Sequence, residues 1–242
     1  MNETVRQLFE RKSVRSFTGD PIPEEIVQEI LLSACMAPTA GNQQLYTILR
    51  ITDPLLLEKL AESCDHQPFI AEGKLVLVFC ADCLKWYSAF LNAGCEPRHP
   101  IAGDLLLAVD DAVIAAQNAV VAAESYGIGS CYIGDIMENI ETQREILNLP
   151  EYVFPAALLV FGYPTEQQKN RIKPERSELR YIVHENRYQR QAAEQLEAML
   201  RVKTRNEDYD SWIKAFCKRK YNSRVSREMT RSVEKALEEF RN

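Results

Sequence analysis

The sequence predicts a mixed α and β fold that ends in a purely helical segment, and three observations support this. Helical and strand patterns alternate along the chain as far as residue 163. A long, strongly apolar helix is expected from about residue 104 to residue 126. After residue 186 only helical periodicity remains. With 242 residues, of which 46% are hydrophobic, the chain can form one large domain or two small ones.

The first third of the chain is expected to form helices and strands in turn. Two prolines, Pro21 and Pro23, precede a segment whose apolar residues recur at helical spacing. The continuous apolar run at residues 75–80 is typical of a strand that is covered on both faces. The expected elements are helices at residues 2–11, 24–36 and 54–63, and strands at residues 46–52 and 75–80.

The long helix carries polar residues in pairs that recur every seven positions, and almost every other position is Leu, Val, Ile or Ala. Such a helix is buried on several sides. It is therefore a central core helix, or one that serves both the core and a subunit interface, and we favour the interface. The polar pairs are Asp110 with Asp111, Gln117 with Asn118, and Glu124 with Ser125. Later elements are a strand at residues 130–133, a helix at 139–148 and a strand at 153–161.

Charge is unevenly distributed along the chain, whose net charge is −6. Residues 187–242 hold 14 lysines and arginines against 9 aspartates and glutamates, a net charge of +5, which leaves −11 for residues 1–186. In the basic part, cations alternate with acidic and apolar residues along helices, and no RNA-binding or zinc-finger signature accompanies them. We therefore expect a solvated or partner-facing helical surface and no nucleic-acid partner.

The N-terminus carries Glu3, Arg6 and Glu10 where a signal peptide would have an apolar core. No stretch approaches the roughly 18 uncharged apolar residues that a membrane-spanning helix needs. We expect a soluble, cytoplasmic protein with no membrane partner.

The seven cysteines are odd in number and lie in apolar surroundings, which indicates reduced thiols. Cys80 and Cys83 form a C-x-x-C pair, so a thiol-redox site or half of a zinc site is one interpretation. The other is small apolar packing at the end of a strand. The chain has three histidines and no second C-x-x-C, so a four-ligand metal site is hard to assemble.

The N-terminal run Arg11–Phe17 places three cations and two hydroxyls within six residues at the end of a short helix. Forked guanidinium donors, an ammonium and small hydroxyls together suit a phosphate monoester. By itself such a run is more often a solvated helix end.

Four further segments have the chemistry of a flavin site. They offer carboxamides, small residues and backbone amides that can bind a polar heteroaromatic edge, and Gly134 permits close backbone approach at a strand's carboxyl end. Two further cations follow the last predicted strand. Each segment alone is more often an ordinary turn. The segments are residues 37–44, Gln67 with Pro68, residues 132–135 and residues 173–176.

Taken together and in this order, these segments resemble the nitroreductase family of FMN-dependent oxidoreductases. The resemblance is greatest to its NADPH-using nitroreductases and flavin reductases, which have a long C-terminal helical extension, and it covers essentially the whole chain. The matching segments are Arg11–Thr18, Ala37–Gln44, Phe79–Asp82, Ala115–Ala119, Ala122–Ser125, Tyr132–Gly134 and Val183–Asn186.

The resemblance implies an α+β fold, a three-layer α/β/α arrangement with a mainly antiparallel central sheet, a long buried central helix and a C-terminal helical extension. Residues 1–186 would form the FMN-binding core, and residues 187–242 would wrap the partner subunit. Two subunits would build two identical FMN sites at their interface, so the expected partner is a second copy of the chain.

The implied enzyme takes hydride from NADPH or NADH at flavin N5 and passes electrons to an acceptor by ping-pong turnover. Nitroaromatics, quinones and free flavins would be the acceptors. Flavin N5 carries the chemistry, so no catalytic side chain and no metal ion are expected. Arg15 and Lys173 would face the flavin N1–C2=O edge. The implied cofactor-binding residues are Arg11, Lys12, Ser13, Val14, Arg15, Thr39, Asn42, Gln44, Gln67, Tyr132, Ile133, Gly134, Asp135, Lys173 and Arg176.

The chain departs from that branch at several positions. Asp135 stands where the branch usually has a second glycine, and Arg11 stands where it usually has histidine. Lys203 and Arg205 are candidates for binding the 2′-phosphate of NADPH, but Glu207 and Asp208 follow them. The preference between NADPH and NADH therefore stays open.

Two alternative hypotheses, from other protein classes, also remain open. One is a thiol-redox or metal protein that uses Cys80 and Cys83. The other is a non-catalytic module that binds flavin or docks an acidic partner. The visible spectrum of the purified protein separates an FMN enzyme from a colourless binding module.

Overall fold

The computed structural model describes residues 1–205 and 207–241. The chain divides into two compact units. The first comprises Met1–Arg171 together with the segment that begins at Glu228, and the second comprises Ile172–Arg227. This division differs from the predicted boundary at residue 186, because the chain leaves the first unit earlier and returns to it near its end.

The first unit is built on a four-stranded sheet in the order β1-β2-β4-β3, and every neighbouring pair is antiparallel. The predicted fold class is therefore confirmed, with the strands close to their expected positions. The two central strands are buried along their whole length, as the apolar run at residues 75–80 indicates. The strands are β1 (Tyr46–Ile51), β2 (Leu75–Asp82), β3 (Gly129–Ile133) and β4 (Val153–Gly162).

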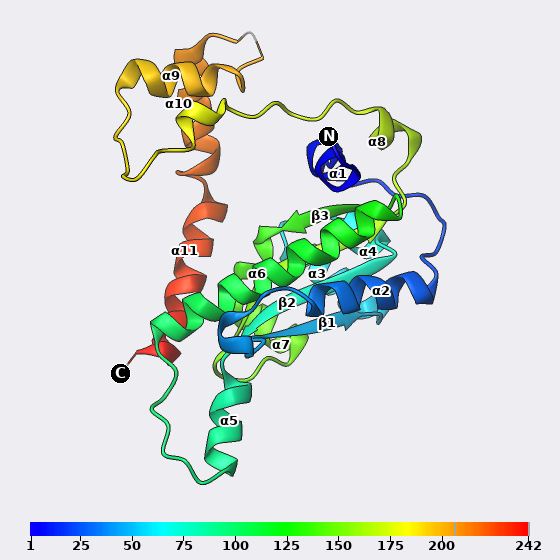
Figure 1. Ribbon diagram of the computed structural model, residues 1–242, viewed down its shortest axis with the longest axis vertical. Coiled ribbons are helices and arrows are strands. Elements are labelled where there is room, and N and C mark those ends of the chain that lie inside the picture. The colour runs from blue at the N-terminus through cyan, green and yellow to red at the C-terminus, as the bar shows by residue number, and fades with distance from the viewer. Residues whose placement is uncertain (206, 242) are drawn as a thin grey trace. The chain divides into compact units, whose positions relative to one another are not determined.

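One face of the sheet is covered by α2 (Glu24–Cys35) and α6 (Ala102–Ser125), which lie in front of the strands in Figure 1. Nine residues of α6 are buried, six of them alanines that let the helix approach its neighbours closely. By length and composition α6 could cross a membrane, but these buried residues belong to the core of the first unit. The predicted central helix is confirmed, and its outward side still exposes Leu106, Val113 and Ile114.

The opposite face of the sheet is covered by α3 (Pro54–Ser63), α4 (Phe69–Glu72) and α7 (Ile140–Leu147). Leu60 and Ile70 are fully buried there against Val78 and Val160 of the sheet. Two separate apolar clusters, one on each face, make this a three-layer α/β/α arrangement, as expected.

Three helices of the first unit were not predicted from the sequence: α4, α5 (Leu84–Asn92) and α8 (Glu166–Asn170). Two of them are only four and five residues long, too short to show a helical period. Helix α5 has no buried residue and leaves Trp86, Phe90 and Leu91 exposed, so its apolar residues do not mark a face turned to the core. The predicted helix at residues 2–11 is present as α1 (Glu3–Glu10).

The second unit contains α9 (Ala193–Arg201), α10 (Tyr209–Lys220) and the start of α11 (Arg224–Leu237). From Glu228 onward the chain packs within the first unit. There Ser232 accepts a hydrogen bond from the backbone N–H of Ile140 at 3.1 Å, and the ring of Phe240 meets that of Tyr152 edge-on. Residues after 186 therefore contribute to the core as well as to the helical extension.

Candidate functional site

The cation-rich N-terminal run lies beside the start of β3. The backbone N–H of Val14 donates to the carbonyl of Ser130 at 2.9 Å, and Ser13 forms a parallel bridge with Ser130. Val14 is only 4% exposed, and an added Cβ at Gly129 would lie 2.5 Å from its Cγ2. Glycine at position 129 thus lets the run pack directly on the strand, which fixes Arg11–Arg15 along β3.

Side chains of this run converge on the thiol of Cys131 in β3. Burial raises the pKa of Cys131, while the positive charges of Arg15 and Arg11 and hydrogen bonds from Ser13 and Arg15 oppose that rise. Three of the predicted phosphate-binding residues therefore lie around one point on the strand. The pKa of the neighbouring Tyr132 is raised to about 12 by burial, again against the charge of Arg11.

The guanidinium of Arg11 gives a further indication that this region suits an anion. Its Nε and Nη2 atoms are shielded from solvent and have no hydrogen-bond partner among the described residues. Shielded guanidinium nitrogen atoms without an acceptor are costly, because they lose hydration and gain no hydrogen bond in exchange. A phosphate oxygen at this position would supply the acceptors that both nitrogen atoms lack.

Lys12, unlike its neighbours in the run, binds backbone carbonyl groups near the end of α8. Its Nζ donates to the carbonyls of Lys169 and Arg171, each at 2.6 Å, and so holds the end of α8 against the N-terminal run. Arg171 reciprocates with a hydrogen bond from its guanidinium to the carbonyl of Ser13. A contact from Lys12 to phosphate stays a prediction, and it would use the remaining donor of the ammonium.

The loop at residues 37–44 is organised by Asp111 of α6, which is buried. Its carboxylate accepts the hydroxyl of Thr39 and the backbone N–H groups of Ala40 at 3.0 Å and Leu45 at 3.1 Å. The hydroxyl of Thr39 therefore points to α6. Sequence reasoning counted Asp111 only as part of a polar pair, although a carboxylate within a nearly continuous apolar helix was a usable signal.

Left-handed backbone conformations shape the same loop, at Gly41 (φ 56°), Asn42 (φ 58°) and Gln44 (φ 51°). Glycine and asparagine adopt this region at low cost. Gln44 donates from Nε2 to the carbonyl of Cys35 at 3.2 Å, whereas Asn42 is exposed. Direct contact of Thr39, Asn42 and Gln44 with a cofactor stays a prediction.

The carboxyl end of β3 brings two predicted residues into direct contact. Nε2 of Gln67 donates to Oδ2 of Asp135 at 2.7 Å and to the carbonyl of Cys64 at 2.8 Å. Ile133 is buried, but Gly134 is exposed, and an added Cβ there would meet no heavy atom within 4 Å. Open space therefore lies beside Gly134, on the strand that also carries the arginine-lined region around Cys131.

Four predicted cations belong to the second unit. Lys173 is half-buried, while Arg176, Lys203 and Arg205 are exposed. Within this unit Thr204 is buried and donates its hydroxyl to the carbonyl of Arg201 at 2.9 Å. Asn206, in the same linker, lies outside the described residues. The roles of these four cations toward FMN or NADPH stay predictions.

The C-x-x-C pair has the chemistry of packed, neutral thiols. Cys80 and Cys83 are both buried and free, and burial raises the pKa of each to about 12. Asp82 adds to the rise at Cys80, and Asp104 and then Asp82 add to it at Cys83. A thiol with such a pKa is almost entirely protonated at neutral pH and is a poor nucleophile or metal ligand. Within residues 1–205 and 207–241 there is no cluster of three or more potential metal ligands. These findings argue against the thiol-redox and metal interpretation.

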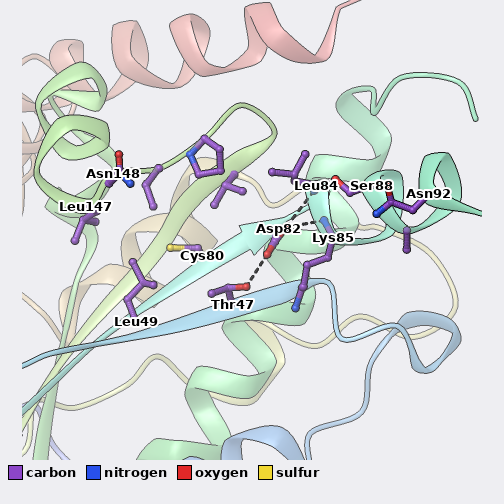
Figure 2. A pocket seen from close by; sticks show the side chains of 14 residues that line it. Thr47, Leu49, Cys80, Asp82, Leu84, Lys85, Ser88, Asn92, Leu147 and Asn148 are labelled. Atoms are coloured by element: carbon purple, nitrogen blue, oxygen red, sulfur yellow. Dashed lines mark hydrogen bonds between the residues drawn. The ribbon is translucent and has the colours of Figure 1, made fainter.

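A pocket of about 550 Å³ lies between the end of β2, α5 and the segment before β4 (Figure 2). Its buried carboxylate, Asp82, accepts the hydroxyl of Thr47 at 2.5 Å and the backbone N–H groups of Leu84 and Lys85 at 3.1 Å each. Asp82 therefore starts helix α5 and has its acceptors occupied. None of the predicted cofactor residues lines this pocket, so it is separate from the predicted FMN site.

Comparisons with known proteins agree with the predicted family. The model of the nitroreductase family matches residues 8–163. A Cr(VI) reductase of Pseudomonas sp. (strain G-1) is 35% identical over 219 residues, which are 87% of this chain and 89% of that protein. An oxygen-insensitive NADPH nitroreductase of Salmonella typhimurium is 33% identical over 78% of this chain and 76% of its own length. The structure of NADPH:FMN oxidoreductase from Vibrio harveyi, complexed with NAD⁺, has a TM-score of 0.83 at 26% identity and covers 98% of both chains.

Proposed function

Since the chain belongs to the nitroreductase family, we propose that it is an FMN-dependent oxidoreductase that uses NADPH or NADH as its electron donor. The observation that carries this proposal is the half-buried Arg11, whose shielded Nε and Nη2 lack partners among the described residues and lie beside the other cations of the run. Relatives named as an FMN reductase and an NADPH nitroreductase support the same chemistry.

The residues of the first unit fit FMN in two places. Arg11, Ser13 and Arg15 would hold the phosphate, because their side chains surround one point on β3. Gln67 and the backbone beside Gly134 would bind the polar edge of the isoalloxazine ring. When bound, FMN supplies the two-electron chemistry, accepting hydride from the nicotinamide coenzyme and passing electrons to the acceptor.

The protein's own contribution is position and electrostatics. Fixed cations near a site that gains negative charge stabilise its reduced form and raise the reduction potential. Arg15, which faces β3, and Lys173 of the second unit are proposed for the electronegative edge of the ring. Thr39, through its hydrogen bond to Asp111, orients the loop that carries Asn42 and Gln44. No side chain of the site is required to take part in covalent chemistry.

We further propose that the enzyme is a cytoplasmic homodimer with its FMN sites at the interface. Helix α6 leaves Leu106, Val113 and Ile114 exposed, and its small residues suit close packing with another helix. An apolar stripe on an otherwise buried central helix is the kind of surface that a second copy covers. Of residues 187–242, the part outside the first unit, residues 187–227, is proposed to wrap the partner.

The visible spectrum of the purified protein tests the proposal. Bands near about 450 and 375 nm that are released on denaturation as FMN, near one per subunit, are expected of a flavoprotein. Rapid mixing should then show bleaching by NADPH or NADH and recovery of colour on adding a quinone, a nitroaromatic, a free flavin or chromate. A colourless protein that cannot be reconstituted with FMN would contradict the proposal.

A further inference from the structure

Glu138 is a buried acid that the family chemistry does not use. It follows the short 3-10 turn η2 (Gly134–Met137), and only 4% of the residue is exposed. Its Oε1 is shielded from solvent and finds no N–H or O–H donor among the described residues. In an ionised Glu138 this oxygen would lack both water and a hydrogen bond, which is an energetically costly arrangement.

The groups that face Glu138 are mainly acidic. They are Asp135 on the same turn, Asp65 after α3, Glu228 on α11 and the thiol of Cys64. Arg231, a cation on α11, directs its guanidinium to Glu141 and Glu228. Burial and, next, the charge of Asp135 raise the pKa of Glu138 to about 7.

Asp135 is held close to Glu138 by the turn itself. The backbone N–H of Glu138 donates to the carbonyl of Asp135 at 3.0 Å, and the two carboxyl groups lie close enough for each to affect the other's charge. Two carboxyl groups can share a hydrogen bond only if one of them carries a proton. Since Gln67 donates to Oδ2 of Asp135, the charge is stabilised on Asp135 and the proton belongs on Glu138.

We infer that Glu138 is the protonated member of a carboxyl pair, that its O–H donates a hydrogen bond to the carboxylate of Asp135, and that it so sets the negative charge that lies beside Gln67 and Gly134. The inference rests on the proposed function in one respect, namely that this place is the isoalloxazine end of the FMN site. Glu138 is a positioning residue that acts through Asp135. Asp135 is itself a departure from the resembling branch, which usually has glycine at this position.

The pair of Glu138 and Asp135 couples proton uptake by Glu138 to the charge of the molecule bound in the site. A gain of negative charge there raises the proton affinity of Glu138, so the protein takes up a proton from solvent at moderately alkaline pH. In that step one O–H bond forms on the Glu138 carboxylate, and no other bond in the pair changes. Reduction of the holoenzyme would therefore be accompanied by protonation of Glu138.

Redox potentiometry at a series of pH values tests the coupling in the yellow holoenzyme. Above about pH 7 the potential of bound FMN should fall more steeply in the wild type than in Glu138→Gln, which cannot ionise. If reduction raises the proton affinity tenfold, the extra fall is about 30 mV for this two-electron couple. Glu145→Gln, the same change at an exposed site on α7, should follow the wild type.

Infrared spectroscopy gives a second readout that does not depend on FMN. A protonated-carboxyl band that is lost in a step near about pH 7 should be present in the wild type and absent from Glu138→Gln. In Asp135→Asn the step should move to lower pH, because the negative neighbour is removed. This variant also serves if Glu138→Gln does not fold.

The outcomes separate the two proposals. Superimposable potential curves for wild type and Glu138→Gln, or the absence of the infrared step, would overturn the carboxyl pair in a protein that is nevertheless yellow. A colourless protein that shows the infrared step would support the pair and count against the FMN function.

Discussion

The carboxylate of Asp111, on the buried side of α6, accepts the backbone N–H of Leu45 at 3.1 Å and ties the loop at residues 37–44 to the central helix. The same carboxylate accepts the N–H of Ala40 and the hydroxyl of Thr39. A loop with three left-handed residues is thus held by one side chain from a distant part of the sequence. The position of Asn42 and Gln44, two of the predicted cofactor-binding residues, therefore depends on α6.

Replacing Asp111 by Ala should destabilise the protein and weaken FMN binding together. The change leaves the N–H groups of Ala40 and Leu45 without their acceptor, and each such loss costs about 1–3 kcal/mol. Urea unfolding should show the loss, and a fluorescence titration should show the weaker binding. Asp110→Ala, at the exposed neighbouring position, is the matched control and should change stability by no more than about 0.5 kcal/mol. If Asp111→Ala and Asp110→Ala were equally stable, the role of Asp111 in holding the loop would be refuted.

Arg11→Ala and Arg15→Ala should each weaken FMN binding by roughly tenfold to a hundredfold, since a charge-assisted hydrogen bond contributes about 1.5–3 kcal/mol. Lysine at either position should recover only part, because the forked geometry is lost. Apoprotein titrated with FMN gives the dissociation constants. Arg6→Ala, which removes an exposed arginine paired with Glu3 and Glu10, serves as control. Unchanged affinity in Arg11→Ala would show that its guanidinium does not bind the phosphate.

Two ion pairs anchor the end of the chain, and they should differ in strength. Arg144 bonds Glu239 through both terminal guanidinium nitrogen atoms, Nη1 and Nη2, and Glu239 also accepts the N–H of Tyr152. With side chains 24% and 19% exposed, this pair is partly buried, whereas Arg231 and Glu141 are about half exposed. Arg144→Met should cost about 1.5–3 kcal/mol and Arg231→Met about 0.2–1 kcal/mol in urea unfolding. The reverse order would contradict this assignment.

The stability of the protein should contain a pH-dependent contribution from Glu138. Its pKa is about 7 in the folded protein and near 4.5 in the unfolded chain, so the folded protein binds more protons between these values. This contribution is complete below about pH 4.5 and is lost as the pH rises through about 7. Other groups titrate as well, so the quantity to measure is the difference in unfolding free energy between wild type and Glu138→Gln. A difference that does not change between about pH 5 and pH 8 would contradict the prediction.

Elements with a strong internal pattern could be predicted from the sequence. The apolar run of β2, the helical period of α2 and the composition of α6 each depend on neighbouring residues, and all three elements formed as expected. What could not be predicted depends on contacts between distant residues. Three examples are the hydrogen bond from Thr39 to Asp111, the bond from Lys12 to the end of α8, and the burial of Glu138. All three depend on tertiary packing, which cannot be predicted from the spacing of neighbouring residues.

The return of the chain to the first unit at Glu228 has a consequence for how the protein responds to a protease. Residues 185–190 are all exposed and include Arg187 and Arg190, both suitable for trypsin. A cut there would separate the polypeptide into two pieces, yet the smaller piece keeps buried Ser232, Ala236 and Phe240 docked in the core. The nicked enzyme should therefore migrate as two bands in denaturing gels and elute as one species under native conditions. Separately expressed fragments divided at this point should reassemble by complementation.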